Sequence, residues 1–251
     1  MAATNHFLDG SDRYARHRPT YPPALAEALA ALAPRRTLAL DVGCGTGQLS
    51  VLLGDCFDAV LATDASAEQI AHASPHPHVR YRQAPAEQAC ADAGSVDLVV
   101  AAQAAHWFDL PAFYAAAQAM AAPGAVIALV TYGVLHIDDA GVEARFRQFY
   151  WHEIAPYWPP ERRHVERRYA DMPFPFAELE FPDTAIVRDW SCDDLLGYVD
   201  TWSASRQARK AGHDALIAGF ATDLRAAWGD PALLRRIVWP LAGRIGQLRA
   251  A

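Results

Sequence analysis

Three glycines at alternate positions, preceded by an acidic residue, are the feature of this sequence that most directly predicts chemistry. They are Gly43, Gly45 and Gly47, and Asp41 stands two residues before the first of them. Glycine has no Cβ, so its backbone accepts a positive φ and can come within contact distance of a ligand. The apolar run before Asp41 is typical of a buried strand, and a helix-forming segment starts near Gln48. Amides at the start of a helix can donate to polar ligand groups, so the pattern predicts a ligand-binding loop.

The spacing of these glycines excludes two common nucleotide loops. The dinucleotide fingerprint is G-x-G-x-x-G, whereas here the third glycine comes one residue early and Gln48 stands in its place. The P-loop ends in Lys followed by Ser or Thr, and this ending is absent. The alternative is a tight turn that binds nothing, but spaced glycines weaken a fold unless the backbone must stay bare.

Polar residues also stand where two further apolar runs end. The carboxylate of Asp64 could accept hydrogen bonds from both hydroxyls of a ribose, or it could cap the next helix. Gln103, His106 and Trp107 follow the apolar run 96–102. Ligands bind beside the carboxyl ends of strands in parallel sheets, so these residues are candidates for a site. His106 is the best candidate for a general base, because the pKa of a histidine can lie near neutrality, and packing is its alternative role.

The elements that must position these residues alternate between strand-like and helix-like segments over residues 22–132. This alternation predicts an α/β fold with a doubly wound, Rossmann-like, mostly parallel sheet of seven strands and helices on both faces. A helical insertion is expected after the fifth strand. The expected strands are 37–42, 59–63, 79–83, 96–102, 125–132, one within 176–190, and 237–241. The expected helices are 22–32, 48–53, 67–73, 111–122, 193–209 and 214–228.

The length of 251 residues suits one α/β domain with insertions. We expect a single domain over residues 1–251. Within it we expect an N-terminal lid and helix over residues 1–33, and a helical cap over residues 138–175.

The pattern Asp41-x-Gly43-x-Gly45-x-Gly47 resembles motif I of the class I S-adenosylmethionine (SAM) dependent methyltransferases. The rest of the chain is similar to their small-molecule branch, that of trans-aconitate methyltransferases with a methyltransferase type 11-like domain. Residues 14–22 match its Tyr-x-x-x-Arg-Pro-x-Tyr-Pro segment, and the residues from Gln103 to Phe108 resemble its segment after the fourth strand. The match is strong at these segments and loose after residue 133.

The resemblance implies SAM as the cofactor, S-adenosylhomocysteine as its product, and roles for particular residues. It implies a lid from residues 14–22, ribose binding by Asp64, and a substrate pocket with His106 at its mouth. The cofactor-binding residues that it implies are Tyr14, Arg18, Tyr21, Asp41, Gly43, Cys44, Gly45, Thr46, Gly47, Asp64, Ala65, Gln69, Ala86, Glu87, Ala102 and Gln103. The substrate residues are His106, Trp107, Tyr132 and Trp202, of which His106 is the catalytic candidate.

The amino-acid composition limits which binding partners and which cellular compartment are expected. A net charge of −7 and a pI of about 5.8 disfavour a nucleic-acid partner. The four cysteines show no metal-ligand spacing and suit a reducing compartment. No run approaches the roughly 18 apolar residues of a membrane span. We therefore expect a cytoplasmic monomer or homodimer that acts on a small molecule, without a metal and without a membrane.

The expected reaction is methyl transfer from SAM to a small-molecule acceptor by direct displacement. We favour O-methylation of a carboxylate, which is already ionised, or of a hydroxyl, which needs a base. Three alternatives stay open. They are C- or N-methylation of a quinone-like or polyketide-like metabolite, SAM binding without turnover, and, more weakly, RNA methylation.

Overall fold

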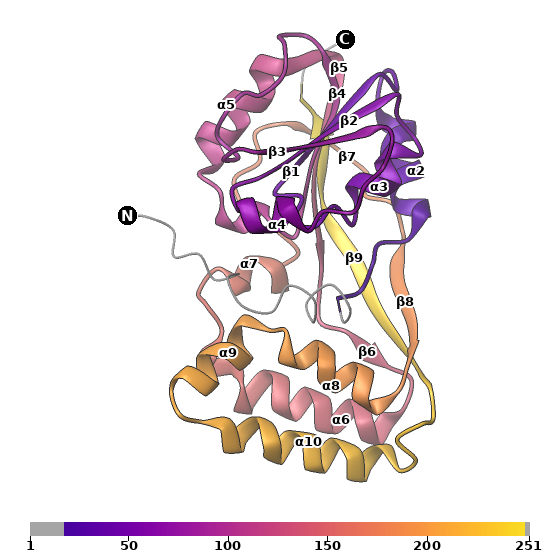
Figure 1. The fold of residues 1–251 in the computed structure, drawn as a ribbon, viewed down its shortest axis with the longest axis vertical. Helices are drawn as coiled ribbons and strands as arrows, with labels where there is room; N and C mark the ends of the chain where they lie inside the picture. The colour runs from indigo at the N-terminus through magenta and orange to yellow at the C-terminus, as the bar shows by residue number, and fades with distance from the viewer. Residues whose placement is uncertain (1–17, 249–251) are drawn as a thin grey trace. The chain divides into compact units, whose positions relative to one another are not determined.

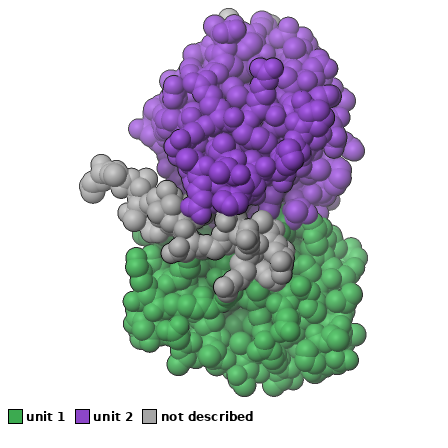
Figure 2. Space-filling view, viewed as in Figure 1, with its two compact units in different colours: residues 1–19, 134–162, 186–239 green, residues 20–133, 163–185, 240–251 purple. Residues whose placement is uncertain are grey.

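The computed structural model describes residues 18–248, which form two compact units. Of the described residues, unit 1 holds 18–19, 134–162 and 186–239, and unit 2 holds 20–133, 163–185 and 240–248 (Figure 2). Each unit is described by itself.

Unit 2 contains the parallel sheet, in the strand order β3-β2-β1-β4-β5. The strands are β1 (Leu38–Val42), β2 (Ala59–Asp64), β3 (Val79–Gln83), β4 (Val96–Ala102) and β5 (Ala121–Tyr132). All four pairings among them are parallel, as in the doubly wound order that places ligands at the carboxyl ends of the strands. Strand β9 (Arg235–Gln247) pairs antiparallel with β5 through residues 241–247, and β7 (Ala177–Leu179) pairs with β9 in turn.

Helices cover both faces of this sheet (Figure 1). Helix α5 (Leu110–Met120) lies on one side, and α2 (Pro23–Leu32) and α3 (Ser50–Gly54) lie on the other. Short helices α4 (Ala67–Ala71) and η1 (Ala105–Trp107) follow the ends of β2 and β4. Pro23 at the first helical position starts α2 because proline needs no amide partner there.

The core of unit 2 forms between β1, β4, β5 and α5. Residues 96–101 of β4 are all buried, as expected for a central parallel strand covered on both faces. The one acid among them, Asp97, accepts hydrogen bonds from the amides of Thr37 and Leu38 at 3.0 and 3.2 Å, and from Arg35 at 3.0 Å. This carboxylate therefore fixes the amino end of β1 beside β4.

Unit 1 is mainly helical. Its helices are α6 (Ala140–Gln148), α8 (Cys192–Asp200), α9 (Ser203–Lys210) and α10 (Asp214–Trp228), with a π-helical turn η2 (Phe149–Glu153) and a 3-10 turn η3 (Ala155–Tyr157). Strand β6 (His136–Ile137) pairs with residues 237–238 of β9, and most of β8 (Ala185–Trp190) also lies in this unit. Helix α7 (Arg162–Glu166) starts at the last residue of the unit 1 segment 134–162, and its other residues belong to unit 2.

The predicted fold class is confirmed, while residues 18–248 contain nine strands rather than the seven predicted. The two-residue β6 is too short to leave an apolar pattern, and the segment 176–190 holds two strands, β7 and β8, instead of one. The helix predicted over 193–209 is two helices, because the backbone at Trp202 is extended and starts α9. The single-domain assignment stays a prediction.

Candidate functional site

The glycine loop after β1 has a left-handed backbone at all three glycines. The φ angles of Gly43, Gly45 and Gly47 are +71°, +57° and +82°, which residues with a side chain rarely adopt. The amides of Gly43 and Cys44 both donate to the carbonyl of Thr63, at 2.7 and 2.9 Å. The loop is thus tied to the end of the neighbouring strand β2.

The three glycines differ in what a side chain would meet. A Cβ at Gly43 would lie 2.5 Å from the Cβ of Ala104, and a Cβ at Gly47 would lie 2.1 Å from the hydroxyl of Tyr81. A Cβ at Gly45 would meet only the amide oxygen of Gln69, at 3.7 Å. The first and third glycines are therefore packed against the protein, and Gly45 is the position where a ligand could reach the backbone.

Asp64 stands at the end of β2 and faces the loop. Its Oδ2 accepts the amide of Gly45 at 2.9 Å, and its Oδ1 accepts the amide of Ser66 at 2.8 Å. A carboxylate has about four acceptor positions, so both oxygens can still accept ribose hydroxyls. Asp64 does not cap the next helix, because Ser66 is the N-cap and accepts the amide of Gln69. Next to it, Ala65 is exposed and its carbonyl accepts the side-chain amide of Gln83.

Two buried acceptors beside the loop have no hydrogen-bond donor within residues 18–248. They are Oδ1 of Asp41 and Oε1 of Gln69. Burial raises the pKa of Asp41 to about 7, while the 2.6 Å bond from the Ser50 hydroxyl lowers it and the Asp64 charge raises it. Burial also raises the pKa of the Cys44 thiol, which therefore stays protonated. Unsatisfied buried acceptors are rare, and here they suit a ligand that carries N–H or O–H donors.

The turn after β4 adopts an unusual conformation at Gln103, whose φ is +55°. Its side-chain Nε2 donates to the carbonyl of Tyr132 at 3.1 Å, and its side-chain Oε1 accepts a hydrogen bond from the Thr131 hydroxyl at 3.2 Å. The side chain of Gln103 therefore holds the end of β5, a role that the sequence did not indicate. Ala102, the last residue of β4, is partly exposed.

His106 and Trp107 follow on η1. Nδ1 of His106 is 2.9 Å from the hydroxyl of Tyr169, and its ring is 4.9 Å from that of Trp107. The Trp107 side chain is 38% exposed. Tyr169 lies in the segment after α7, and its sequence neighbourhood did not predict a role for it, because a lone tyrosine there belongs to no motif.

Of the other predicted residues of unit 2, Ala86 and Glu87 lie on the turn after β3, Tyr132 ends β5, and Tyr21 lies on the segment before α2. Oε1 of Glu87 accepts the amide of Asp109, the N-cap of α5, at 3.0 Å. Ala86, beside Glu87, packs against the core. Tyr132 and Tyr21 are both buried, with ring centroids 6.3 Å apart.

Two predicted residues lie in unit 1. The Arg18 guanidinium donates to the carbonyl of Thr201 at 3.4 Å and lies 5.7 Å from the Tyr198 ring. Trp202 is buried in an aromatic cluster that includes Phe149, Tyr150, Trp158 and Tyr198. Tyr14 lies outside the described residues.

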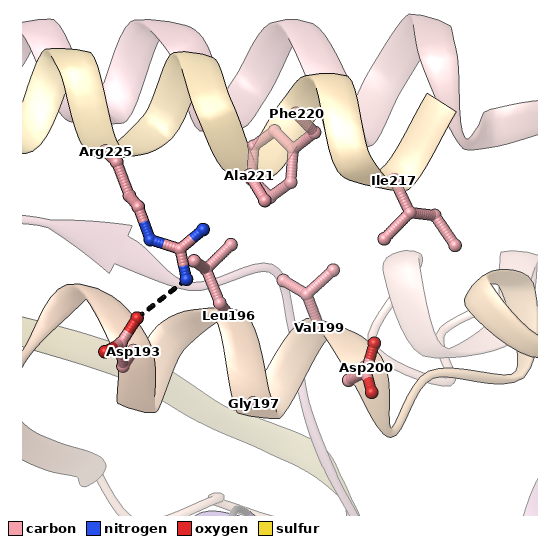
Figure 3. Close-up of a pocket in the computed structure, with 9 residues that line it drawn as sticks. All are labelled: Asp193, Leu196, Gly197, Val199, Asp200, Ile217, Phe220, Ala221 and Arg225. Atoms are coloured by element: carbon pink, nitrogen blue, oxygen red, sulfur yellow. Dashed lines mark hydrogen bonds and ion pairs between the residues drawn. The ribbon is translucent and has the colours of Figure 1, made fainter. Parts of the chain in front are cut away.

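Unit 1 also has a surface hollow of about 270 Å³ between α8 and α10 (Figure 3). Its apolar wall includes Leu196, Ile217 and Phe220, and the ion pair Asp193–Arg225 closes one end at 2.9 Å. None of the predicted site residues lines it. Within residues 18–248, no group of three His, Cys, Asp or Glu side chains is placed to hold a metal ion, and no helix is long and apolar enough to cross a membrane.

The doubly wound sheet, with a glycine loop after β1 and acidic residues at the ends of β1 and β2, defines the class as a Rossmann-like α/β protein. Residues 40–129 match the family described as "Methyltransferase domain". A candidate methyltransferase of Dictyostelium discoideum is 31% identical over 231 residues, which cover 89% of this chain and 88% of that protein. A solved structure of a candidate type II methyltransferase from Anaeromyxobacter dehalogenans is 46% identical, with a TM-score of 0.87, and the match covers 93% of this chain and 99% of that one.

The chain therefore belongs to the SAM-dependent methyltransferases. The structure of the YcgJ protein from Bacillus subtilis, 14% identical with a TM-score of 0.53, shares the fold alone.

Proposed function

We propose that this enzyme binds SAM against Gly45 and methylates an oxygen of a small-molecule acceptor, preferably a carboxylate as in the trans-aconitate branch. The observation that carries the cofactor half of the proposal is the loop at Gly45. It has room for a ligand on one side and the Asp64 carboxylate bonded to its amide. Both belong to one sheet edge, where the carboxyl ends of the parallel strands meet.

The hydrogen-bonding groups around the loop fit SAM. Asp64 would accept the ribose hydroxyls, and the bare backbone at Gly45 would lie beside the ligand. The buried acceptors on Asp41 and Gln69 would receive N–H or O–H donors, which SAM carries on its amino, ribose and adenine groups. When bound, SAM supplies an electrophilic methyl group on a positively charged sulfur.

The acceptor half of the proposal places His106, Trp107, Tyr132 and Trp202 at the substrate. A carboxylate acceptor needs no base, and the enzyme's main task is then to hold nucleophile and methyl close and to exclude water. Exposed Trp107 beside His106 offers a ring for such a substrate.

A labelled-methyl screen with product analysis tests this proposal. Carboxyl methyl esters release methanol in mild base, whereas methyl groups on nitrogen or carbon do not. We expect base-labile label on small di- or tricarboxylic acids with the wild type. Asp64→Ala should lose this activity, while the matched change of an exposed acid, Asp92→Ala, should retain it. Base-stable label alone would exclude a carboxylate acceptor, and mass spectrometry of the product would then distinguish an O-methyl ether from N- or C-methylation. No transfer to any acceptor would favour SAM binding without turnover.

We further propose that residues 1–251 act as one methyltransferase domain, with residues 1–33 as an N-terminal lid and helix and residues 138–175 as a helical cap. The four free cysteines support a cytoplasmic location, and the net charge of −7 argues against a nucleic-acid partner. A monomer or a homodimer is compatible with this proposal.

A further inference from the structure

A buried tyrosine from a distant segment of unit 2 lies against His106. The hydroxyl of Tyr169 is 2.9 Å from Nδ1 of His106, and the two ring centroids are 5.9 Å apart. Tyr169 is fully buried, whereas His106 is partly exposed. One nitrogen of the histidine ring is thus held from the protein interior.

The backbone that carries Tyr169 is held in an uncommon conformation. The φ angles of Arg168 and Tyr169 are +56° and +62°, a region that bulky residues rarely occupy. The amide of Tyr169 donates to the carbonyl of His164 at 2.8 Å, and the ring of His164 lies 2.9 Å from a carboxylate oxygen of Asp171. Such conformations persist where the surrounding structure enforces them, and they concentrate at functional sites.

The direction of the bond between Tyr169 and His106 follows from the acidity of the two groups. A phenol releases its proton near pH 10, and an imidazole nitrogen accepts one near pH 6.5, so O–H to N is the favourable direction. A neutral imidazole carries one N–H. When Nδ1 accepts the phenol hydrogen, the ring hydrogen is on Nε2.

We propose that Tyr169 is a positioning residue that fixes neutral His106 in the tautomer with hydrogen on Nε2. His106 then offers a hydrogen-bond donor to an anionic oxygen of the acceptor instead of acting as its base. This inference rests on the proposed function, and it deepens it, because a donor at this position suits a carboxylate and does not activate a neutral hydroxyl.

The tautomer can be observed directly by nitrogen NMR of protein labelled with 15N-histidine, at about pH 8.5, where an ordinary imidazole is neutral. We expect the His106 signals of the Nε2–H form in the wild type. In Tyr169→Phe we expect averaged signals from both tautomers. Tyr114→Phe is the matched control, because Tyr114 is also a buried tyrosine of unit 2, bonded instead to the carbonyl of Pro173. Its His106 signals should equal those of the wild type.

Two NMR results would overturn the inference: an Nδ1–H form in the wild type, or an unchanged tautomer in Tyr169→Phe. If Tyr169→Phe does not fold, two substitutions of His106 replace it. Gln places an N–H near the position of Nε2–H, and Asn places one near Nδ1. His106→Gln should therefore retain at least tenfold more transfer to a carboxylate than His106→Asn, and the reverse order would contradict the inference. Absence of methyl transfer by the wild type would refute the proposed function, whereas the NMR experiment would still determine the tautomer of His106.

Discussion

At the scale of single residues, the three loop glycines have separable roles that substitution can distinguish. Gly45 and Gly94 both have a positive φ and room for a Cβ, but only Gly45 lies in the loop beside Asp64. We expect each change to alanine to cost about 1–2 kcal/mol of stability, because a side chain is strained in the left-handed region. Only Gly45→Ala should weaken SAM binding. Urea unfolding and calorimetric titration measure the two effects.

Equal SAM affinity in the two alanine variants would remove Gly45 from the cofactor site. Gly47→Ala provides a further comparison, since its Cβ would lie 2.1 Å from the Tyr81 hydroxyl. It should be less stable than Gly45→Ala, because a clash adds to the same backbone strain.

The buried carboxyl of Asp41 gives a prediction on pH. Burial raises its pKa from 3.8 to about 7, so between these values the folded protein binds more protons at this site than the unfolded chain does. The contribution of Asp41 therefore destabilises the ligand-free protein increasingly as the pH rises from about 4 to about 7. Asp41→Asn should raise the melting temperature more at pH 8 than at pH 4.5. An equal change at both pH values would show that Asp41 is ionised throughout.

Residue types and spacing predicted the loop glycines and Asp64, because a carboxylate after a strand and bare backbone are chemical requirements that the sequence displays. They did not predict Tyr81 beside Gly47, Tyr169 beside His106, or the bonds of Gln103 to the end of β5. Each of these depends on a partner that only the tertiary fold brings near. The position of the glycine loop could therefore be predicted from the sequence, whereas the tertiary contacts that support it could not.

At the scale of elements, Asp97 is the residue that joins two central strands. Its buried carboxylate binds the amides of Thr37 and Leu38 and the side chain of Arg35. Asp97→Ala would remove the acceptor of these three hydrogen bonds, and hydrogen bonds to charged groups contribute about 1.5–3 kcal/mol each. We expect a loss of several kcal/mol in urea unfolding, with SAM affinity unchanged in the folded fraction. A loss below about 0.5 kcal/mol would contradict this role.

Hydrophobic patterning predicted β3, β4 and α10 with their observed bounds, but it predicted only residues 237–241 of β9, which spans Arg235–Gln247. The short strands β6 and β7 were not predicted, because strands of two and three residues are too short to show a hydrophobic periodicity. The break at Trp202 was also missed, although Thr201 and Ser203 beside it are weak helix formers. The Trp202 ring packs in the aromatic core of unit 1.

That packing gives a prediction for Trp202 itself. Trp202 is 3% exposed and stacks with Phe149, so Trp202→Ala should cost about 3–5 kcal/mol of stability by leaving a cavity. Thermal or urea unfolding measures this cost. Trp202→Phe should fold, and a raised KM for the acceptor with unchanged SAM affinity would support the proposed substrate role. Unchanged acceptor kinetics would assign Trp202 to the core alone.

At the scale of the whole molecule, the cofactor half of the function is better defined than the acceptor half. The matched methyltransferase segment, residues 40–129, lies entirely in unit 2, together with the glycine loop, Asp64 and His106. Unit 1 carries Arg18 and Trp202, and the resemblance to the family is loose over its residues after 133. Acceptor choice therefore needs the labelled-methyl screen, whereas SAM binding can be tested at once.

The most direct test of the account is isothermal titration of SAM and S-adenosylhomocysteine into the wild type, Asp64→Ala and Asp92→Ala. We predict micromolar binding by the wild type and by Asp92→Ala, and at least tenfold weaker binding by Asp64→Ala, which corresponds to about 1.4 kcal/mol. Equal binding by all three proteins would contradict the role of Asp64. Absence of binding by the wild type would contradict the proposed cofactor site at the glycine loop.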